Sequence, residues 1–146
     1  SGSSLAEFLD DEVFGPLDLE MAVDPRGAWQ QVGDGSIWTT PTDLVRWSRQ
    51  YWDQTLVGPD LRRVMFEPEV NASEQGDETG DTYGAGIVRG FDEDGTEVLS
   101  HDGSWDDYET DWAVIPDEGL AAAVTCNARA TVDDDSLARE LIELWR

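Results

Sequence analysis

The chain has 146 residues, 39% of them hydrophobic, which is enough for one domain with its own hydrophobic core. Its charge is strongly unbalanced, because 33 acidic residues face nine basic ones and give a formal net charge of −24. All nine basic residues are arginine, and the chain contains no lysine. Such a surface repels phosphate groups, so nucleic acid and anionic membrane surfaces are poor partners.

The acidic composition is typical of a protein that works at high salt concentration, where screening removes the repulsion between carboxylates. An ordinary acidic protein encoded by a GC-rich genome is the alternative interpretation. The chain has no run of 18 apolar residues that could span a membrane, and its first residues lack the features of a signal peptide. The compartment therefore stays undetermined.

Helical patterns dominate the first half of the chain. Residues 3–19 place apolar side chains at helical spacing behind a serine cap, with Gly15-Pro16 as a stop. Residues 18–37 are rich in glycine and predict a loop with one short strand. A helix is predicted over 41–54, because a threonine, a proline and an aspartate occupy its cap, first position and capping-box position. Another helix is predicted within 58–68.

Residues 69–81 are polar and predict a surface loop, after which the pattern becomes extended. A first strand pair is predicted around the Asp94-Gly95 turn, and a second around Pro116–Gly119. The tail predicts a C-terminal helix after the acidic residues 133–135, with four residues on its apolar face: Leu137, Leu141, Ile142 and Trp145.

The order of these elements predicts an α+β fold. Residues 1–68 form a mainly helical part, and residues 82–146 form an antiparallel β-meander with the C-terminal helix packed on it. We treat 1–146 as a single domain.

His101 is the only histidine, and it lies in an Asp-Gly-Ser segment between two apparent strands. A lone histidine in such a place is most often exposed or structurally hydrogen-bonded. Cys126 is the only cysteine, and its apolar surroundings predict a packed small side chain rather than a nucleophile.

Two other features have plain structural interpretations. The acidic clusters at 92–95 and 133–135 lack the twelve-residue spacing of a calcium loop, so we expect a hairpin turn and a helix start, and no metal or cofactor. The seven tryptophans, among them Trp47 and Trp145, occupy apolar positions that predict core packing rather than a carbohydrate platform.

Several segments together resemble a known family. The segments "GSIWTTPTDLVRW", "YGAGIVRG", "SHDGSW" and "DWAVIPDEGLAAAVTCN" follow one another in the order seen in the serine β-lactamase and penicillin-binding-protein-like superfamily, in its class C and esterase branch. The opening "SGSSLAEFLDDEVFGPLDL" is similar to the helix that follows the second catalytic motif of that family. The resemblance spans nearly the whole chain and implies a partial β-lactamase/transpeptidase-like fold.

The resemblance implies roles for the segment around His101. "HDG" matches the third family motif, Lys-Thr-Gly or His-x-Gly, on the strand beside the nucleophile. Gly103 would leave room for the substrate, the backbone N–H of Ser104 would be one oxyanion donor, and His101 would face the substrate carboxylate and the tyrosine relay. The same segment implies a set of substrate-binding residues: Asp102, Trp105 and Tyr108.

The chain also departs from the family pattern. Without lysine it has no Ser-x-x-Lys motif, and none of its tyrosines begins a Tyr-x-Asn motif. Asp107-Tyr108 stands where the family usually has Gly-Phe or Gly-Tyr. Ser104 is a poor nucleophile candidate, because strand alternation places it and His101 on opposite faces.

The chain thus looks like the C-terminal half of a serine hydrolase that acts on a β-lactam, a D-amino-acid peptide or an ester. Because a nucleophile needs an activating base, we expect this chain alone to be inactive. A non-catalytic binding module on the same scaffold is the alternative. The expected partners are a small acyl substrate and either a second copy of the chain or a missing N-terminal half, since such a half-fold would expose apolar surface.

Overall fold

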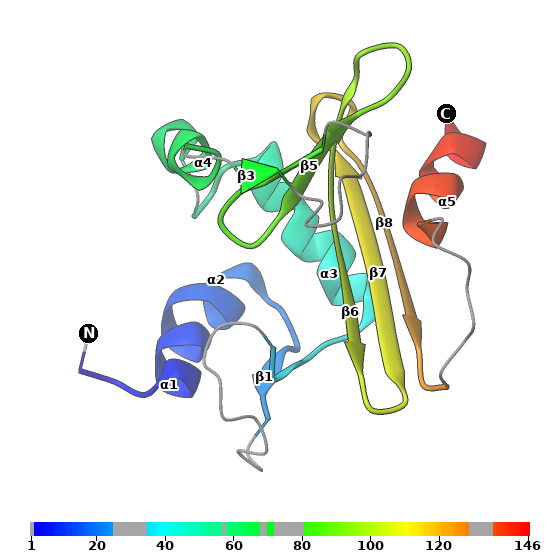
Figure 1. The fold of residues 1–146 in the computed structure, drawn as a ribbon. Coiled ribbons are helices and arrows are strands. Elements are labelled where there is room, and N and C mark those ends of the chain that lie inside the picture. Colours follow the sequence, from blue (N-terminus) through cyan, green and yellow to red (C-terminus); the bar gives the residue numbers. More distant parts are fainter. Residues whose placement is uncertain (1, 25–34, 57, 68–69, 72–80, 129–135) are drawn as a thin grey trace.

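An antiparallel sheet with helices on both faces forms the centre of the molecule. The computed structural model describes residues 2–24, 35–56, 58–67, 70–71, 81–128 and 136–146. The main sheet has the strand order β3-β4-β5-β6-β7-β8. Helix α3 (Pro41–Ser48) lies on one face and helix α5 (Leu137–Trp145) on the other (Figure 1). The predicted α+β fold is confirmed.

The N-terminal segment is helical for longer than its sequence predicts. Helix α1 (Leu5–Leu9) leads into a wide π-type turn, η1 (Asp10–Phe14), and then into the single turn α2 (Gly15–Leu17). The expected stop at Gly15-Pro16 is wrong. The backbone N–H of Gly15 reaches the Asp10 carbonyl across the wide turn, and Pro16 lies in the first turn of α2, where a missing N–H costs no helical hydrogen bond.

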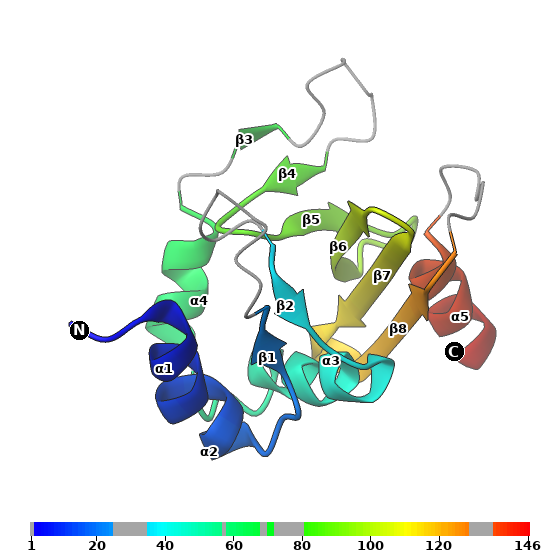
Figure 2. The same ribbon diagram turned by 90° about the horizontal axis from the view of Figure 1, so that it is seen from below.

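A small hairpin and a capped helix follow. Strands β1 (Ala22–Val23) and β2 (Ile37–Trp38) pair with each other, outside the main sheet (Figure 2). The Thr40 hydroxyl then accepts the N–H of Asp43 at 3.1 Å, which is the predicted cap of α3. The α-helix ends at Ser48 and continues as a 3₁₀ turn, η2 (Arg49–Tyr51), so the predicted helix over 41–54 is shorter than expected.

The next segment contains one predicted helix and a predicted strand that the structure shows as two separate strands. Helix α4 (Pro59–Met65) lies where it was expected. Strand β3 (Val70–Asn71) lies inside the predicted 69–81 loop, most of which falls outside the described residues. The expected strand after it is interrupted between β4 (Thr82–Tyr83) and β5 (Val88–Phe91), because the chain reverses where Gly84 N–H bonds the Ile87 carbonyl at 2.9 Å.

Three long strands complete the sheet: β6 (Glu97–Trp105), β7 (Tyr108–Ile115) and β8 (Leu120–Cys126). Both predicted turns are confirmed, with Gly95 at φ 86° before β6 and Gly119 at φ 65° after η3 (Pro116–Glu118). Strand β6 pairs with β7 as far as the Trp105–Tyr108 pair. His101 therefore lies within a strand and not in a turn.

Each face of the sheet has its own core. Leu99, Trp112 and Val114 face α3, where they pack with Tyr51, Phe66 and Ile87. Val98, Ala113 and Ile115 face α5, where they pack with Ala138 and Ile142. The buried Trp112 indole N–H donates to the Ser48 hydroxyl at 2.7 Å, which in turn donates to the Leu44 carbonyl at 2.8 Å. This chain of hydrogen bonds fixes α3 on the sheet.

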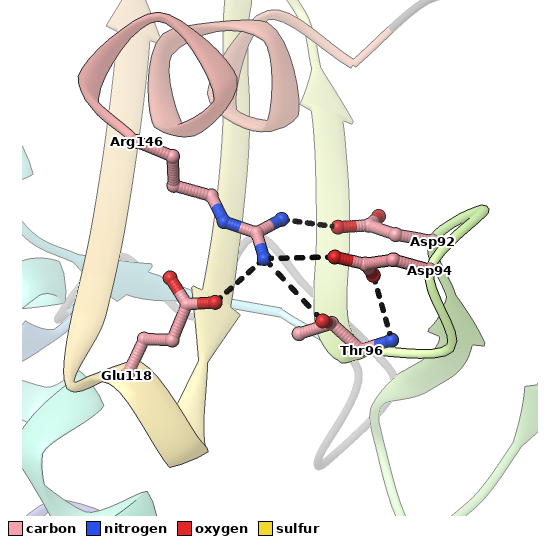
Figure 3. A network of polar contacts seen from close by, with 5 residues as sticks. All are labelled: Asp92, Asp94, Thr96, Glu118 and Arg146. Carbon is pink, nitrogen blue, oxygen red and sulfur yellow. Dashed lines mark hydrogen bonds and ion pairs between the residues drawn. The ribbon is translucent and has the colours of Figure 1, made fainter.

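Polar contacts hold both ends of α5. At its start, the Asp111 carboxylate accepts the Ala138 N–H at 2.7 Å and the Ser136 hydroxyl at 3.0 Å. At its end, the Arg146 guanidinium reaches three carboxylates in two turns of the sheet: Asp92 at 2.8 Å, Asp94 at 3.3 Å and Glu118 at 2.6 Å (Figure 3). The hydrogen bond to Glu118 is the main cause of a raised Arg146 pKa.

The apolar face predicted for α5 is only partly buried. Ile142 is buried, but Leu141 is 47% exposed and Trp145 is 84% exposed, so the core position predicted for Trp145 is wrong. The sequence pattern also missed Ala138, which is fully buried. The acidic residues 133–135 lie outside the described part of the chain.

Candidate functional site

The lone histidine is held by two polar contacts on opposite sides of its ring. Its Nδ1 lies 2.5 Å from the Asp102 carbonyl oxygen, and its Nε2 lies 2.9 Å from the Tyr83 hydroxyl. A carbonyl oxygen only accepts, so Nδ1 carries a proton. In the neutral ring Nε2 then accepts a hydrogen bond from the Tyr83 hydroxyl, an assignment that follows from the partners.

Tyr83 comes from β4, two strands away from β6 in the sheet. The Tyr83–Val88 and Val88–Ser100 pairs bring it beside the start of the His101 segment. Its ring packs edge-on against the imidazole, with 5.8 Å between ring centroids. The "YGAG" segment is the sequence signal for this residue, which is not among the predicted site residues.

Gly103 leaves the strand surface open. A Cβ atom at this position would meet only the Thr110 side chain at 3.9 Å, which is ordinary contact. The backbone is not in the left-handed region, so the fold itself does not require glycine here. Because Gly103 has no side chain, the strand surface beside His101 is not covered at this position.

Strand β6 has an unpaired edge next to this stretch. The last β5–β6 pair is Val88–Ser100, and within the described residues no strand continues β5 beside 101–105. Asp92 N–H donates to the Thr96 carbonyl, so even-numbered residues of β6 direct their backbone groups towards β5. By the same alternation, the N–H groups of Asp102 and Ser104 point to the open edge.

Three aromatic side chains lie at the tip of the β6–β7 hairpin. Trp105 and Tyr108 face each other across the two strands, and Trp38 of β2 packs edge-on against Tyr108 at 5.3 Å between centroids. All three are exposed. They share the sheet face of His101 and Gly103, so they extend the open stretch with an apolar surface.

The structure separates the predicted site residues into two groups. His101, Gly103, Trp105 and Tyr108 share the α3 face, whereas the side chains of Asp102 and Ser104 point to the α5 face. The Ser104 hydroxyl therefore does not meet His101, as alternation predicted. Only the backbone groups of Asp102 and Ser104 contribute to the edge beside His101.

The surroundings of the hairpin tip are acidic. Asp106 and Asp107 form its turn, and Glu109 follows on β7. Among the residues the structure describes, no group of three or more histidine, cysteine or carboxylate side chains could hold a metal ion. No helix in the described part of the chain is long and apolar enough to cross a membrane.

Comparison with known proteins identifies the scaffold. The Beta-lactamase family model matches residues 1–144. The chain belongs to this family. No curated protein matches it.

Solved structures of related hydrolases share the fold at low sequence identity. The octameric penicillin-binding protein homologue from Pyrococcus abyssi is 18% identical, with a TM-score of 0.77, over 99% of this chain and 38% of its own. The beta-lactamase/D-alanine carboxypeptidase from Yersinia pestis is 17% identical, with a TM-score of 0.67, over 97% of this chain and 49% of its own.

A third similar structure is the D-amino acid amidase from Ochrobactrum anthropi, 15% identical with a TM-score of 0.67, over 97% of this chain and 49% of its own. The chain thus spans half or less of the length of these three proteins. The β-lactamase/transpeptidase-like fold is present in part.

Proposed function

We propose that this chain supplies the substrate-binding strand and one oxyanion-hole donor of a serine hydrolase of the beta-lactamase family. The observation that carries the proposal is the unpaired edge of β6, where the Ser104 N–H points outward beside the bare Gly103. An N–H fixed on an open strand edge is suited to stabilise the oxyanion of an acyl-transfer reaction.

The neighbouring residues have matching roles in this proposal. The backbone of Asp102 and Ser104 would hydrogen-bond an extended substrate, while Gly103 leaves space for it above the strand. The hydrogen bond from Tyr83 orients His101, whose polar imidazole would lie beside the reacting group of the substrate. The aromatic surface of Trp105 and Tyr108 would contact the apolar part of the substrate.

The nucleophile and its base would come from outside this chain. The sequence has no lysine for a Ser-x-x-Lys motif, and Ser104 and His101 point to opposite faces. We therefore propose that the isolated chain does not turn over substrate. The complete enzyme would act on a β-lactam, a D-amino-acid peptide or amide, or an ester, in keeping with the amidase and carboxypeptidase among its structural neighbours.

A non-catalytic binding module is the second candidate, and the absence of a nucleophile–base pair favours it. In that case the same edge would hold a ligand or a protein partner without chemistry. Its partner would be a second copy of the chain or a separate N-terminal half. A ligand that raises the melting temperature of the isolated chain without being consumed would support this function.

Intact mass spectrometry tests the first proposal directly. The purified chain, with a mass of 16.2 kDa, is incubated separately with a fluorophosphonate and with a penicillin. We expect no mass shift with either reagent. A covalent adduct on this chain would overturn the proposal, and loss of that adduct in Ser104→Ala would identify Ser104 as the nucleophile.

A further inference from the structure

We propose that Arg139 of α5 is a positioning residue of the site, because it holds together the two segments that make the Tyr83–His101 hydrogen bond. This inference rests on the proposed function, in which His101 lies beside the reacting group of the substrate. It adds to the site a residue from the opposite face of the sheet.

The Arg139 guanidinium has one partner beside β4 and one within β6. Its Nη2 atom lies 3.7 Å from an Asp81 carboxylate oxygen and donates to the Ser100 hydroxyl at 3.3 Å. Asp81 comes two positions before Tyr83, and Ser100 comes directly before His101. One side chain therefore links the two segments whose next residues form the hydrogen bond of the site.

The sheet leaves space for this ion pair at Gly90 of β5. A Cβ atom at Gly90 would lie 2.4 Å from Oδ1 of Asp81, which is too close for real atoms, and 3.0 Å from Nη2 of Arg139. The Gly90 backbone lies outside the left-handed region, so its conformation does not require glycine. The Asp81–Arg139 pair thus occupies the space that a side chain of β5 would otherwise fill.

Strand β4 needs an additional contact because it is short. It consists of Thr82 and Tyr83, and these two residues form its register with β5. The chain then reverses at Gly84. The side chains of Asp81 and Arg139 are only 21% and 31% exposed, so solvent screens their attraction incompletely. The ion pair therefore helps to set where β4 places the Tyr83 hydroxyl.

Arg139 acts from behind the strand that carries the site. Ser100 pairs with Ala113, which packs under α5, whereas His101 pairs with Trp112 on the α3 face. Strand alternation thus separates the guanidinium from the imidazole by the thickness of the sheet. Arg139 can orient the site from this position without filling the space beside Gly103.

Imidazole spectra of an Arg139→Met variant test the proposal. Methionine keeps a long side chain but carries no charge and donates no hydrogen bond. We expect the ratio of the Nε2–H to the Nδ1–H tautomer of His101 at pH 8 to rise about threefold, because a displaced Tyr83 hydroxyl donates less often to Nε2. Long-range ¹H–¹⁵N correlation spectra measure this ratio.

Arg146→Met is the matched control. It removes a guanidinium at the other end of α5, whose carboxylate partners lie in two turns of the sheet: Asp92, Asp94 and Glu118. The tautomer ratio should then equal that of the original chain, with circular dichroism showing that both methionine variants fold. An equal shift in both variants would mean that any loosening of α5 disturbs His101, and it would overturn the specific role of Arg139.

Two further variants test the route from Arg139 to His101. Asp81→Asn removes the partner charge with little change of shape, so it should shift the ratio in the same direction, and it carries the test if Arg139→Met does not fold. Arg139→Met added to Tyr83→Phe should cause no further shift, because the route through the tyrosine hydroxyl is already broken. A further shift in that background, or unchanged spectra in both Arg139→Met and Asp81→Asn, would overturn the proposal.

The positioning role and the hydrolase function fail in different experiments. The imidazole spectra are recorded on the chain without substrate, so they do not depend on acylation. A covalent adduct in the mass spectra would overturn the proposed function and leave the tautomer ratios as they are. Unchanged tautomer ratios without an adduct would overturn only the role of Arg139.

Discussion

The hydrogen bond between Tyr83 and His101 defines the chemical state of the only imidazole in the chain. Because Nδ1 donates to a backbone carbonyl, the neutral ring presents Nε2 as an acceptor to the tyrosine hydroxyl. The histidine is thereby oriented by one residue from its own strand and one from β4. This arrangement makes Tyr83 a positioning residue of the proposed site.

Removal of the tyrosine hydroxyl should change the tautomer of His101. At pH 8 we expect the original chain to hold the Nδ1–H form, and we expect Tyr83→Phe to gain Nε2–H form because Nε2 loses its donor. Long-range ¹H–¹⁵N correlation spectra of the imidazole measure this, and one histidine leaves no ambiguity of assignment.

Tyr108→Phe is the matched control, since it removes a hydroxyl on the same sheet face and keeps the ring that packs against Trp38. Its imidazole spectrum should equal that of the original chain. A predominant Nε2–H form before any substitution would contradict the assignment.

The part of this site that could be predicted is the part encoded in consecutive residues. "HDGSW" placed His101, Gly103 and the Ser104 backbone on one strand, and the alternation of that strand predicted the separation of Ser104 from His101. Tyr83 was missed because its contact depends on the pairing of three strands, which no local pattern specifies.

At the scale of the element, the 92–96 turn is both a hairpin and a docking point for α5. Hydrogen bonds from Thr96 are the main cause of a lowered Asp94 pKa, and Arg146 adds to this effect (Figure 3). A lowered folded-state pKa means that the ionised form is favoured by folding. The stabilising contribution of the ionised Asp94 carboxylate is fully present when the pH lies above 3.8, the ordinary pKa of the group. This contribution is lost as the pH falls through the folded-state pKa.

Asp94→Asn should therefore make the melting temperature less dependent on pH between 6 and 2. The original chain should exceed the variant in melting temperature at pH 6, and the difference should shrink as the pH falls. Glu93→Gln removes a charge from an exposed neighbour in the same turn, and it serves as the control. A difference that stays constant across this range would contradict a role for the ionised Asp94.

Elements with local signals were predictable, and those that depend on distant packing were not. The Asp94-Gly95 turn and the threonine cap of α3 follow from neighbouring residues. The reversal at Gly84, in contrast, depends on the Ile87 side chain reaching the core, and the exposure of Trp145 depends on how α5 lies on β7 and β8. A helical pattern predicts which residues share a face but not how much of that face is covered.

For the whole molecule, charge is the dominant feature. At −24, repulsion between carboxylates opposes the compact state, and at about 0.1 M salt it acts over roughly 10 Å. We expect the melting temperature to rise between 0.05 M and 2 M NaCl. Glycine betaine at the same osmolality is the control, because it does not screen charge. An equal rise in both solutions would show that the effect is not electrostatic and would count against adaptation to high salt.

The register of the β6–β7 hairpin has a consequence for how this protein tolerates changes in length. Strand β6 carries residues of both cores and of the proposed site. Leu99 is buried on the α3 face of this strand, and His101 and Gly103 lie on the same face further along, where it is open. One residue inserted between Leu99 and His101 would rotate the site to the α5 side while the core stayed in place. Two inserted residues would restore the face. Variation of this strand between relatives should therefore occur in steps of two residues.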